Sequence, residues 1–282
     1  MTDPQFGREL PLFEAGFEAC SVLHRNFICF TDKHERILMV LDPGLHAKTA
    51  VVEHYDEIVK QPTQVEKYRS FSIIVLARLD EVSQMQQGRV AKWLLQLARN
   101  HSDLVCIGTI KRAAGLSGFL KSCFWFATQG PQGDIVGNKI TGKSPNNVSV
   151  HVALKRYILD IIIHIRMHRL VVTAKGGGAG MNSLQDIIDL SQWMVAKNAS
   201  SRKQFVTPDV IQQASVWYFP LHMELLKEPF HDSSVLYASD VKLVEELINQ
   251  LKKLALRVGR DNPLMLEIIV VKDVLSKVVP AI

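Results

Sequence analysis

The pattern of hydrophobic and polar residues changes near the middle of the chain. In the first half, short apolar runs rich in β-branched and aromatic residues alternate with stretches of helical spacing. Such runs are typical of buried parallel strands, and their alternation with helices predicts an α/β fold with a mostly parallel sheet. The predicted strands are Phe27–Phe30, Phe71–Ala77, Leu104–Thr109 and Cys123–Ala127, with a further strand at either Thr49–Val52 or Ile37–Leu41.

The second half has the longer periods of amphipathic helices. Apolar residues recur at helical spacing over Leu154–Ile165, which predicts a helix that ends near Leu170. The next helix has Asn182 or Ser183 as its N-cap. Between the two helices lies a glycine-rich loop, which indicates positive φ angles or a close approach to another backbone. Its glycines are Gly176, Gly177, Gly178 and Gly180.

Start and stop residues delimit the remaining helices. After a short strand, Thr207 as N-cap and Pro208 at the first helical position predict a third helix, which Pro220 should kink or end. Two further helices are expected at Val241–Leu251 and Leu264–Val279. The last of them is apolar on almost every side, so it must be buried in its own fold or in a partner.

These patterns divide the chain into two parts. Residues 1–149 form the α/β core, and their segment 130–149, rich in Gly, Pro, Asn and Ser, forms the connector. Residues 150–282 form an all-helical part that includes the C-terminal helices. A chain of 282 residues is long enough to bury a sizeable core in one or two domains.

The second half carries a resemblance to known families. A helix ending in HRL, a loop of small residues, a helix opened by SL and a third helix announced by FVTPDVI are similar to the helical lid of AAA+ ATPases of the MoxR branch. The segments KRYILDIIIHIRMHRL, WYFPLHMEL and VVKDVLSKVVP resemble the fungal maintenance of telomere capping protein 2 family. The resemblance implies an AAA+-like parallel α/β core followed by a helical lid, and a nuclear role at chromosome ends.

An active AAA+ domain needs a phosphate loop after its first strand. There, glycines let backbone N–H groups surround the phosphates and a lysine neutralises them. Residues 137–144 match that pattern around Lys143, but a turn follows them and they stand just before the lid. Nearer the first strand, residues 42–49 contain Lys48 without the preceding glycine, and residues 31–36 contain no glycine. Both of these alternatives are broken loops.

The other catalytic groups of such a domain are also missing or displaced. The pair Asp80-Glu81 resembles the acids that hold Mg²⁺ and its water, but Arg78 stands at the expected strand end and would repel the ion. The following strand is succeeded by Lys111 instead of a polar amide. The resemblance places Cys123 and Met181 where active relatives carry their finger and sensor arginines. Together these departures predict a lost active site.

Other candidate chemistry is weaker. His164 and His168 have the spacing of zinc ligands on a helix, but neither a glutamate between them nor a third ligand is signalled, so no metal is expected. Ser117 and Cys123 lack a base partner that the sequence reveals. The aromatic run Trp217–Phe219 has helical spacing, which favours a core or interface position over stacking on nucleic-acid bases.

Composition and charge narrow the picture only a little. The net charge of +5 is spread along the chain and is compatible with an acidic partner or with nucleic acid. No uncharged apolar run reaches the roughly 20 residues that a membrane span needs. The cysteines show no CxxC spacing, which indicates reduced thiols in an intracellular protein. They are Cys20, Cys29, Cys106 and Cys123.

The sequence thus predicts a pseudo-ATPase, a non-enzymatic AAA+-like interaction module with no catalytic residue, cofactor or metal. We expect a monomer or a small hetero-complex with protein partners, and not a hexamer or a membrane protein. Its contacts should use the basic, aromatic lid surface around Arg166, Arg169 and Trp217, or the last helix. Two alternatives stay open: an NTP-binding switch or ATPase that uses Lys143 or Lys48, and a basic nucleic-acid-binding protein.

Overall fold

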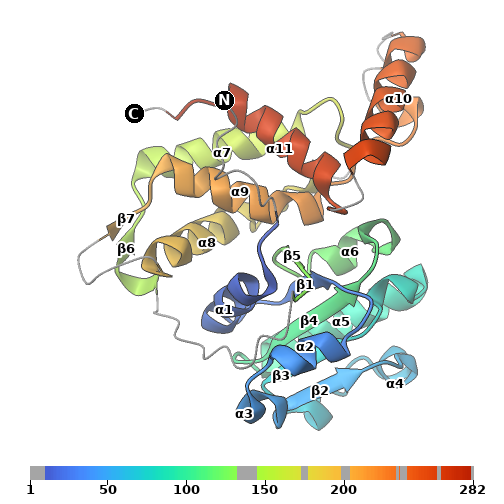
Figure 1. Ribbon diagram of the computed structural model, residues 1–282, viewed down its shortest axis with the longest axis vertical. Helices are drawn as coiled ribbons and strands as arrows, with labels where there is room; N and C mark the ends of the chain where they lie inside the picture. The colour runs from blue at the N-terminus through green and yellow to red at the C-terminus, as the bar shows by residue number, and fades with distance from the viewer. Residues whose placement is uncertain are drawn as a thin grey trace. The chain divides into compact units, whose positions relative to one another are not determined.

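The computed structural model describes residues 10–131, 145–172, 177–197, 204–232, 235, 240–258 and 262–280. These residues form two compact units (Figure 1). Residues 10–131 make an α/β unit, and the described residues from 145 onward make a helical unit. The predicted class, a parallel α/β core followed by helices, is therefore confirmed. Among the described residues, no helix is both long and apolar enough to cross a bilayer.

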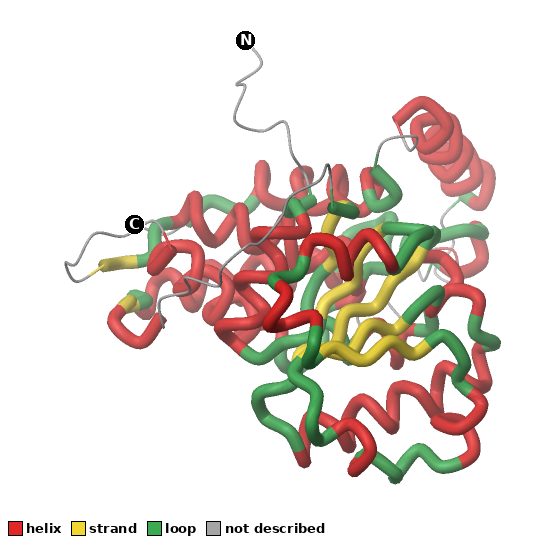
Figure 2. The backbone as a smooth tube through the Cα atoms, turned by 60° about the horizontal axis from the view of Figure 1, so that its bottom comes forward, coloured by secondary structure: helices red, strands yellow, loops and turns green. Residues whose placement is uncertain are grey.

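A five-stranded parallel sheet is the centre of the α/β unit, and Figure 2 shows its strands side by side. In space the strands follow the order β2-β3-β4-β1-β5, so β1 lies between the later strands β4 and β5. Each neighbouring pair is parallel. Both β3 and β4 are buried along their whole length, which is why they appear in the sequence as uninterrupted apolar runs. The strands are β1 (Phe27–Phe30), β2 (Thr49–Val52), β3 (Ile73–Leu76), β4 (Val105–Ile110) and β5 (Ala127–Gln129).

Two of the strand predictions need correction. The alternative strand at Ile37–Leu41 is wrong, because residues Glu35–Val40 form a short helix, α2, that buries Ile37 and Val40. Thr49–Val52 is the strand instead. The last strand begins at Ala127, four residues after the predicted start at Cys123. The segment before it approaches β1 through the hydrogen bond from Ile28 N to Phe126 O (3.0 Å), but enters the regular ladder only at Ala127.

Helices cover both faces of this sheet. The chain passes from β1 to the far edge strand β2, and then returns across the sheet through β3 and β4 to β5. Right-handed crossovers therefore place the helices that follow β1 on one face, and those that follow β2, β3 and β4 on the other. The α-helices are α1 (Phe13–Leu23), α2, α3 (Pro43–His46), α4 (Asp56–Lys60), α5 (Gln84–Asn100) and α6 (Gly118–Lys121). Short 3-10 turns lie at η2 (Glu66–Tyr68), η3 (Leu79–Glu81) and η4 (Ala113–Gly115).

The helical unit is built on the packing of α9 against α8 and α11, with α7 against α8 and α11. The apolar helix α11 buries Ile268, Val270, Val271 and Val274, so it is buried in its own fold, as one of the two predicted options had it. Figure 1 shows α10 at the edge of this unit. The helices are α7 (Val152–Arg166), α8 (Ser183–Lys197), α9 (Pro208–His222), α10 (Val241–Val258) and α11 (Met265–Lys277). Shorter elements are η5 (Pro145–Asn147), η7 (Pro229–His231) and the parallel pair β6 (Val148–Ser149) with β7 (Gln204–Phe205).

The glycine loop is explained by both of the predicted reasons. Gly177 and Gly178 have positive φ angles of 63° and 78°. A Cβ atom on Gly178 would lie 2.6 Å from the carbonyl oxygen of His222, and one on Gly177 would lie 2.8 Å from the Cα atom of Arg166. The Arg166 guanidinium donates hydrogen bonds to Ala179 O at 2.6 and 3.1 Å. The loop therefore fits between the C-terminal ends of α7 and α9. Gly176 lies outside the described residues.

The helix boundaries confirm some of the predicted start and stop residues. Pro208 opens α9, with Thr207 at the N-cap position. Asn182 precedes α8 and its carbonyl accepts from Asp186 N, whereas Ser183 is the first helical residue and is fully buried, so the alternative N-cap at Ser183 is wrong. Pro220 does not end α9, which continues to His222.

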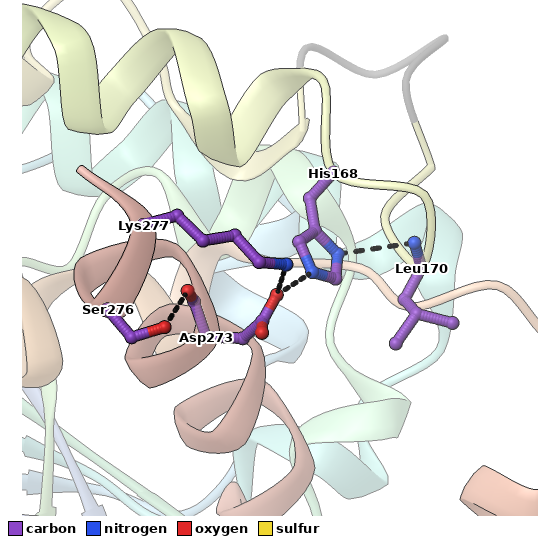
Figure 3. A network of polar contacts seen from close by, with 5 residues as sticks. All are labelled: His168, Leu170, Asp273, Ser276 and Lys277. Carbon is purple, nitrogen blue, oxygen red and sulfur yellow. Dashed lines mark hydrogen bonds and ion pairs between the residues drawn. The ribbon is translucent and has the colours of Figure 1, made fainter.

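A polar network attaches the end of α7 to α11 (Figure 3). Leu170 N donates to His168 Nδ1 at 3.3 Å, so His168 carries its proton on Nε2 and donates it to Asp273 Oδ2 at 3.1 Å. Lys277 donates to the same carboxylate oxygen. The hydrogen bond from Lys277, reinforced by the one from His168, lowers the pKa of Asp273.

Two helical glycines, one packed against β5 and one facing open space, predict opposite effects on substitution by alanine. Alanine in a helix interior is favoured over glycine by about 1 kcal/mol. Gly88→Ala in α5 has open space for the new methyl group, so it should raise the free energy of unfolding. In α1, Gly16→Ala would place its Cβ atom 2.3 Å from Thr128 Cγ2, and this overpacking should destabilise the protein by about 1–3 kcal/mol. Urea denaturation of both variants measures the contrast, and equal effects would contradict the described packing.

The network on α11 predicts a stability difference that depends on pH. Because the pKa of Asp273 is lowered in the folded chain, its contribution is present above the ordinary carboxyl pKa and is lost as the pH falls through the folded value. Asp273→Asn should therefore cost about 0.5–1 kcal/mol near pH 7, a modest figure because the carboxylate is partly exposed, and the cost should shrink below about pH 4. Denaturation curves across this range test it, with the exposed carboxylate Asp160→Asn as control.

Candidate functional site

The carboxyl edge of the parallel sheet is the place where this fold would position a ligand. In open α/β sheets, ligands bind beyond the carboxyl ends of the strands, where neighbouring strands continue in opposite directions. That point lies between β1 and β4, because the chain leaves β1 toward β2 and leaves β4 toward β5. The loops that surround it follow β1, β3 and β4. Their side chains decide whether the edge can hold a nucleotide.

The loop after β1 is a short, self-contained turn. The Thr31 hydroxyl accepts from Lys33 N and donates to Lys33 O, both at 3.2 Å. His34 Nε2 lies 3.0 Å from a carboxylate oxygen of Glu53, which follows β2. Gly130 crosses so close to the end of β1 that a Cβ atom there would lie 2.8 Å from Phe30 O. The turn has no glycine to expose several N–H groups to a phosphate.

The end of β3 is fixed from both sides. Arg78 has a left-handed backbone with φ of 52°, which is uncommon for a residue other than glycine. Its N–H donates to the hydroxyl of Thr109 on β4 at 2.9 Å. The Tyr55 hydroxyl donates to Ala77 O at 2.7 Å, and burial raises the pKa of this phenol far above its usual range. The strained turn at Arg78 is thus held by two neighbouring elements.

Asp80 connects the loop after β3 to the loop after β4. Its Oδ2 atom accepts from Lys111 N and from Arg112 N, both at 3.1 Å. Its Oδ1 atom is buried and has no hydrogen-bond partner within the described part of the chain. A Cβ atom on Gly115 would lie 3.0 Å from Asp80 O, so the two loops are in close contact. The carboxylate therefore serves as an acceptor for backbone amides of its own fold.

A buried glutamine completes the closure of this edge, and the sequence did not single it out. Gln87 donates from Nε2 to Val82 O and Gly115 O, both at 2.8 Å, and accepts from Ser117 N at 2.7 Å. This one side chain joins the loop after β3 to the loop after β4. Nothing distinguishes Gln87 in sequence from its neighbours in the glutamine-rich start of α5, because only its burial sets it apart. The roles of Tyr55 and Thr109 also become visible only in the folded structure, through their hydrogen bonds to Ala77 O and Arg78 N.

Lys48, one of the two lysines proposed for a phosphate loop, does not lie at this edge. Lys48 directly precedes β2, and its carbonyl accepts from Ser72 N, just before β3. It therefore lies at the amino edge of the parallel sheet, opposite the carboxyl edge. Residues 42–49 also follow a helix and not a strand, which removes the reason for aligning them with a phosphate loop. Lys143 and the rest of residues 137–144 lie outside the described residues.

The remaining candidates are used by the fold itself. Burial raises the pKa of the Cys123 thiol to about 11 and that of Cys29 to about 12, which disfavours the thiolate form of both. His164 donates from Nδ1 to Asp160 O at 2.7 Å, and His168 belongs to the network with Asp273. Across the described ranges, no group of three or more His, Cys, Asp or Glu side chains is arranged to hold a metal.

The predicted interaction surface of the helical unit is also partly engaged. The guanidinium of Arg166 is bound to Ala179 O, and that of Arg169 lies 3.8 Å from a carboxylate oxygen of the buried Asp232. Trp217 packs against Trp193, with ring centroids 6.4 Å apart. Tyr218 is buried and donates to Asp186 Oδ2 at 3.1 Å. The aromatic run therefore contributes to the core of the helical unit, as its spacing favoured.

Comparison with known proteins places the chain among fungal relatives. No family model matches it. It is 38% identical over 278 residues to maintenance of telomere capping protein 2 of Eremothecium gossypii, covering 97% of this chain and 98% of the relative. Proteins of the same name from Lachancea thermotolerans and Kluyveromyces lactis are 33% identical over 292 residues (99% and 97% covered) and 31% identical over 279 residues (94% and 97% covered). This chain belongs to the fungal maintenance of telomere capping protein 2 family.

Proposed function

We propose that this protein acts in telomere capping as a non-catalytic, AAA+-like interaction module. The name of its relatives supports the process, and with it a nuclear location at chromosome ends. The parallel sheet followed by helices supports the AAA+-like interpretation of the fold. The absence of catalysis is inferred from the carboxyl edge of the sheet.

The observation that carries this proposal is the use of Asp80. A carboxylate that holds Mg²⁺ and orients water must present its oxygens to the ligand site. Here one oxygen of Asp80 accepts two backbone N–H groups and the other is buried. Arg78, two residues before Asp80 in the chain, adds a positive charge to this loop, which disfavours a metal ion there. The edge is thus organised for internal cohesion, and the protein acts through its surface with protein partners.

The first test is a titration of the full chain with Mg²⁺ and ATP. We expect neither saturable binding by calorimetry nor phosphate release above background. Lys48→Ala and Lys143→Ala serve as controls, because they remove the lysines of the alternative phosphate loops. Turnover that either substitution abolished would overturn the non-catalytic proposal. In a fungal strain whose only copy carries both substitutions, telomere capping should be retained.

The second test separates a structural from a catalytic acidic pair. Asp80→Ala leaves two backbone N–H groups without their acceptor, so it should lower the free energy of unfolding by about 2 kcal/mol. Glu81→Ala removes only a half-exposed ion pair with Arg78 at 3.7 Å and should cost less than about 0.5 kcal/mol. Urea denaturation gives both values. Equal, small effects would show that Asp80 does not bridge the loops after β3 and β4.

A further inference from the structure

Helix α7 has two apolar faces, and only one of them is in the core. The buried face consists of Tyr157, Ile158, Ile161, Ile162 and Ile165. Four other apolar side chains remain exposed: Val152 by 60%, Leu159 by 42%, Ile163 by 47% and Met167 by 75%. We call these four residues the outer face of α7.

The outer face is a continuous line and not a scatter of single residues. Its members follow one another at intervals of seven, four and four positions. With about 3.6 residues per turn, these intervals place all four side chains within an arc of about 80°. The line runs the length of a helix of 15 residues, which is about 22 Å. Single exposed apolar residues need no explanation, but an aligned set along a rigid helix is typical of a docking surface.

The charges beside this line are mostly positive. Arg156 falls within the line and Lys155 lies next to it, and both are exposed. Neither has a hydrogen bond or an ion pair within the described residues. The other nearby arginines are occupied, since Arg166 holds Ala179 O and Arg169 reaches Asp232. Asp160 is the one carboxylate on the exposed side of α7 itself. A binding partner would therefore gain from negative charge near its own apolar positions.

We propose that the outer face of α7 binds an amphipathic helix of a partner protein, with acidic residues flanking its apolar positions. This inference rests on the proposed function as an interaction module and names the surface and the chemistry of the partner. A helix with apolar residues at i, i+3 or i+4, and i+7 lies along such a line, and its carboxylates reach Lys155 and Arg156.

Other occupants fit the outer face less well. In a pairing of α7 with a second copy, the unpaired cations of one helix would add to those of the other, with a single carboxylate from each side to offset them. The line is also too narrow for the roughly 1,000 Å² that a stable dimer buries. A membrane surface would need a broad apolar face, and the broad face of α7 is in the core of the helical unit. The small area predicts transient binding, in the micromolar range.

The experiment uses the full chain and two fluorescein-labelled helical peptides of about 16 residues, long enough to span the line. Both carry leucines at i, i+4 and i+7; one has glutamates beside them and the other has lysines. By fluorescence anisotropy, the glutamate peptide should bind saturably and at least about tenfold more tightly than the lysine peptide. Ile163→Ser should weaken binding of the glutamate peptide by about tenfold. Leu95→Ser, at a similarly exposed leucine of α5, should leave it unchanged.

A charge-exchange variant keeps the test independent of packing. Arg156→Glu should weaken binding of the glutamate peptide and strengthen binding of the lysine peptide. Equal binding of both peptides, or binding that Ile163→Ser does not change, would overturn the proposal. Self-association that Ile163→Ser abolishes, or binding of the chain to phosphatidylserine vesicles through α7, would also overturn it. So would a larger fall in Tm for Ile163→Ser than for Leu95→Ser, because that result would show that the chain itself covers this face. These results leave the ATP titration unaffected, so failure here is distinguishable from failure of the non-catalytic proposal.

Discussion

The arrangement of the α/β unit depends on the parallel pairing of β1 between β4 and β5. These contacts join residues about 80 to 100 positions apart, as in the register of Phe27 with Ile107 and of Ile28 with Ala127. Because every strand runs in the same direction, the pairing brings the loops after β1, β3 and β4 to one edge of the sheet. Their polar groups then meet there whether or not a ligand binds. In this protein those polar groups form hydrogen bonds with one another.

An active nucleotide site must keep donors and acceptors available until the ligand arrives, and this costs stability in the empty state. In the α/β unit, the chain itself satisfies the corresponding groups, apart from Asp80 Oδ1, which is buried without a partner among the described residues. Tyr55 bonds to Ala77, Thr109 accepts from Arg78, and Asp80 accepts from Lys111 and Arg112. Each contact connects the end of one strand to its neighbour. These contacts stabilise the sheet at this edge and support the turn at Arg78, whose φ angle is positive.

The sequence predicted the layers of this fold better than the details of its edge. Buried strands such as β3 and β4 are visible as apolar runs because both of their faces are covered. The helix α2 was open to misassignment, because its six residues contain the run Ile37–Leu41 and are too few to display a helical period. The role of Gln87 was invisible for a different reason: one glutamine among several is selected only by the loops that close over it. The turn after β1, by contrast, is recognisable in the sequence as a loop without glycine, since residues 31–36 contain none.

In the helical unit too, many polar side chains are used in hydrogen bonds within the chain. Its loops and helix ends are tied down by internal bonds, with Arg166 on Ala179 and His168 on Asp273. A side chain already committed to its own backbone has little left to offer a partner, because exchanging one good hydrogen bond for another gains almost no free energy. Exposed groups without such commitments are the ones that can supply binding energy. On α7 these are an aligned set of apolar side chains and two cations, which is why the proposed binding surface lies on this helix.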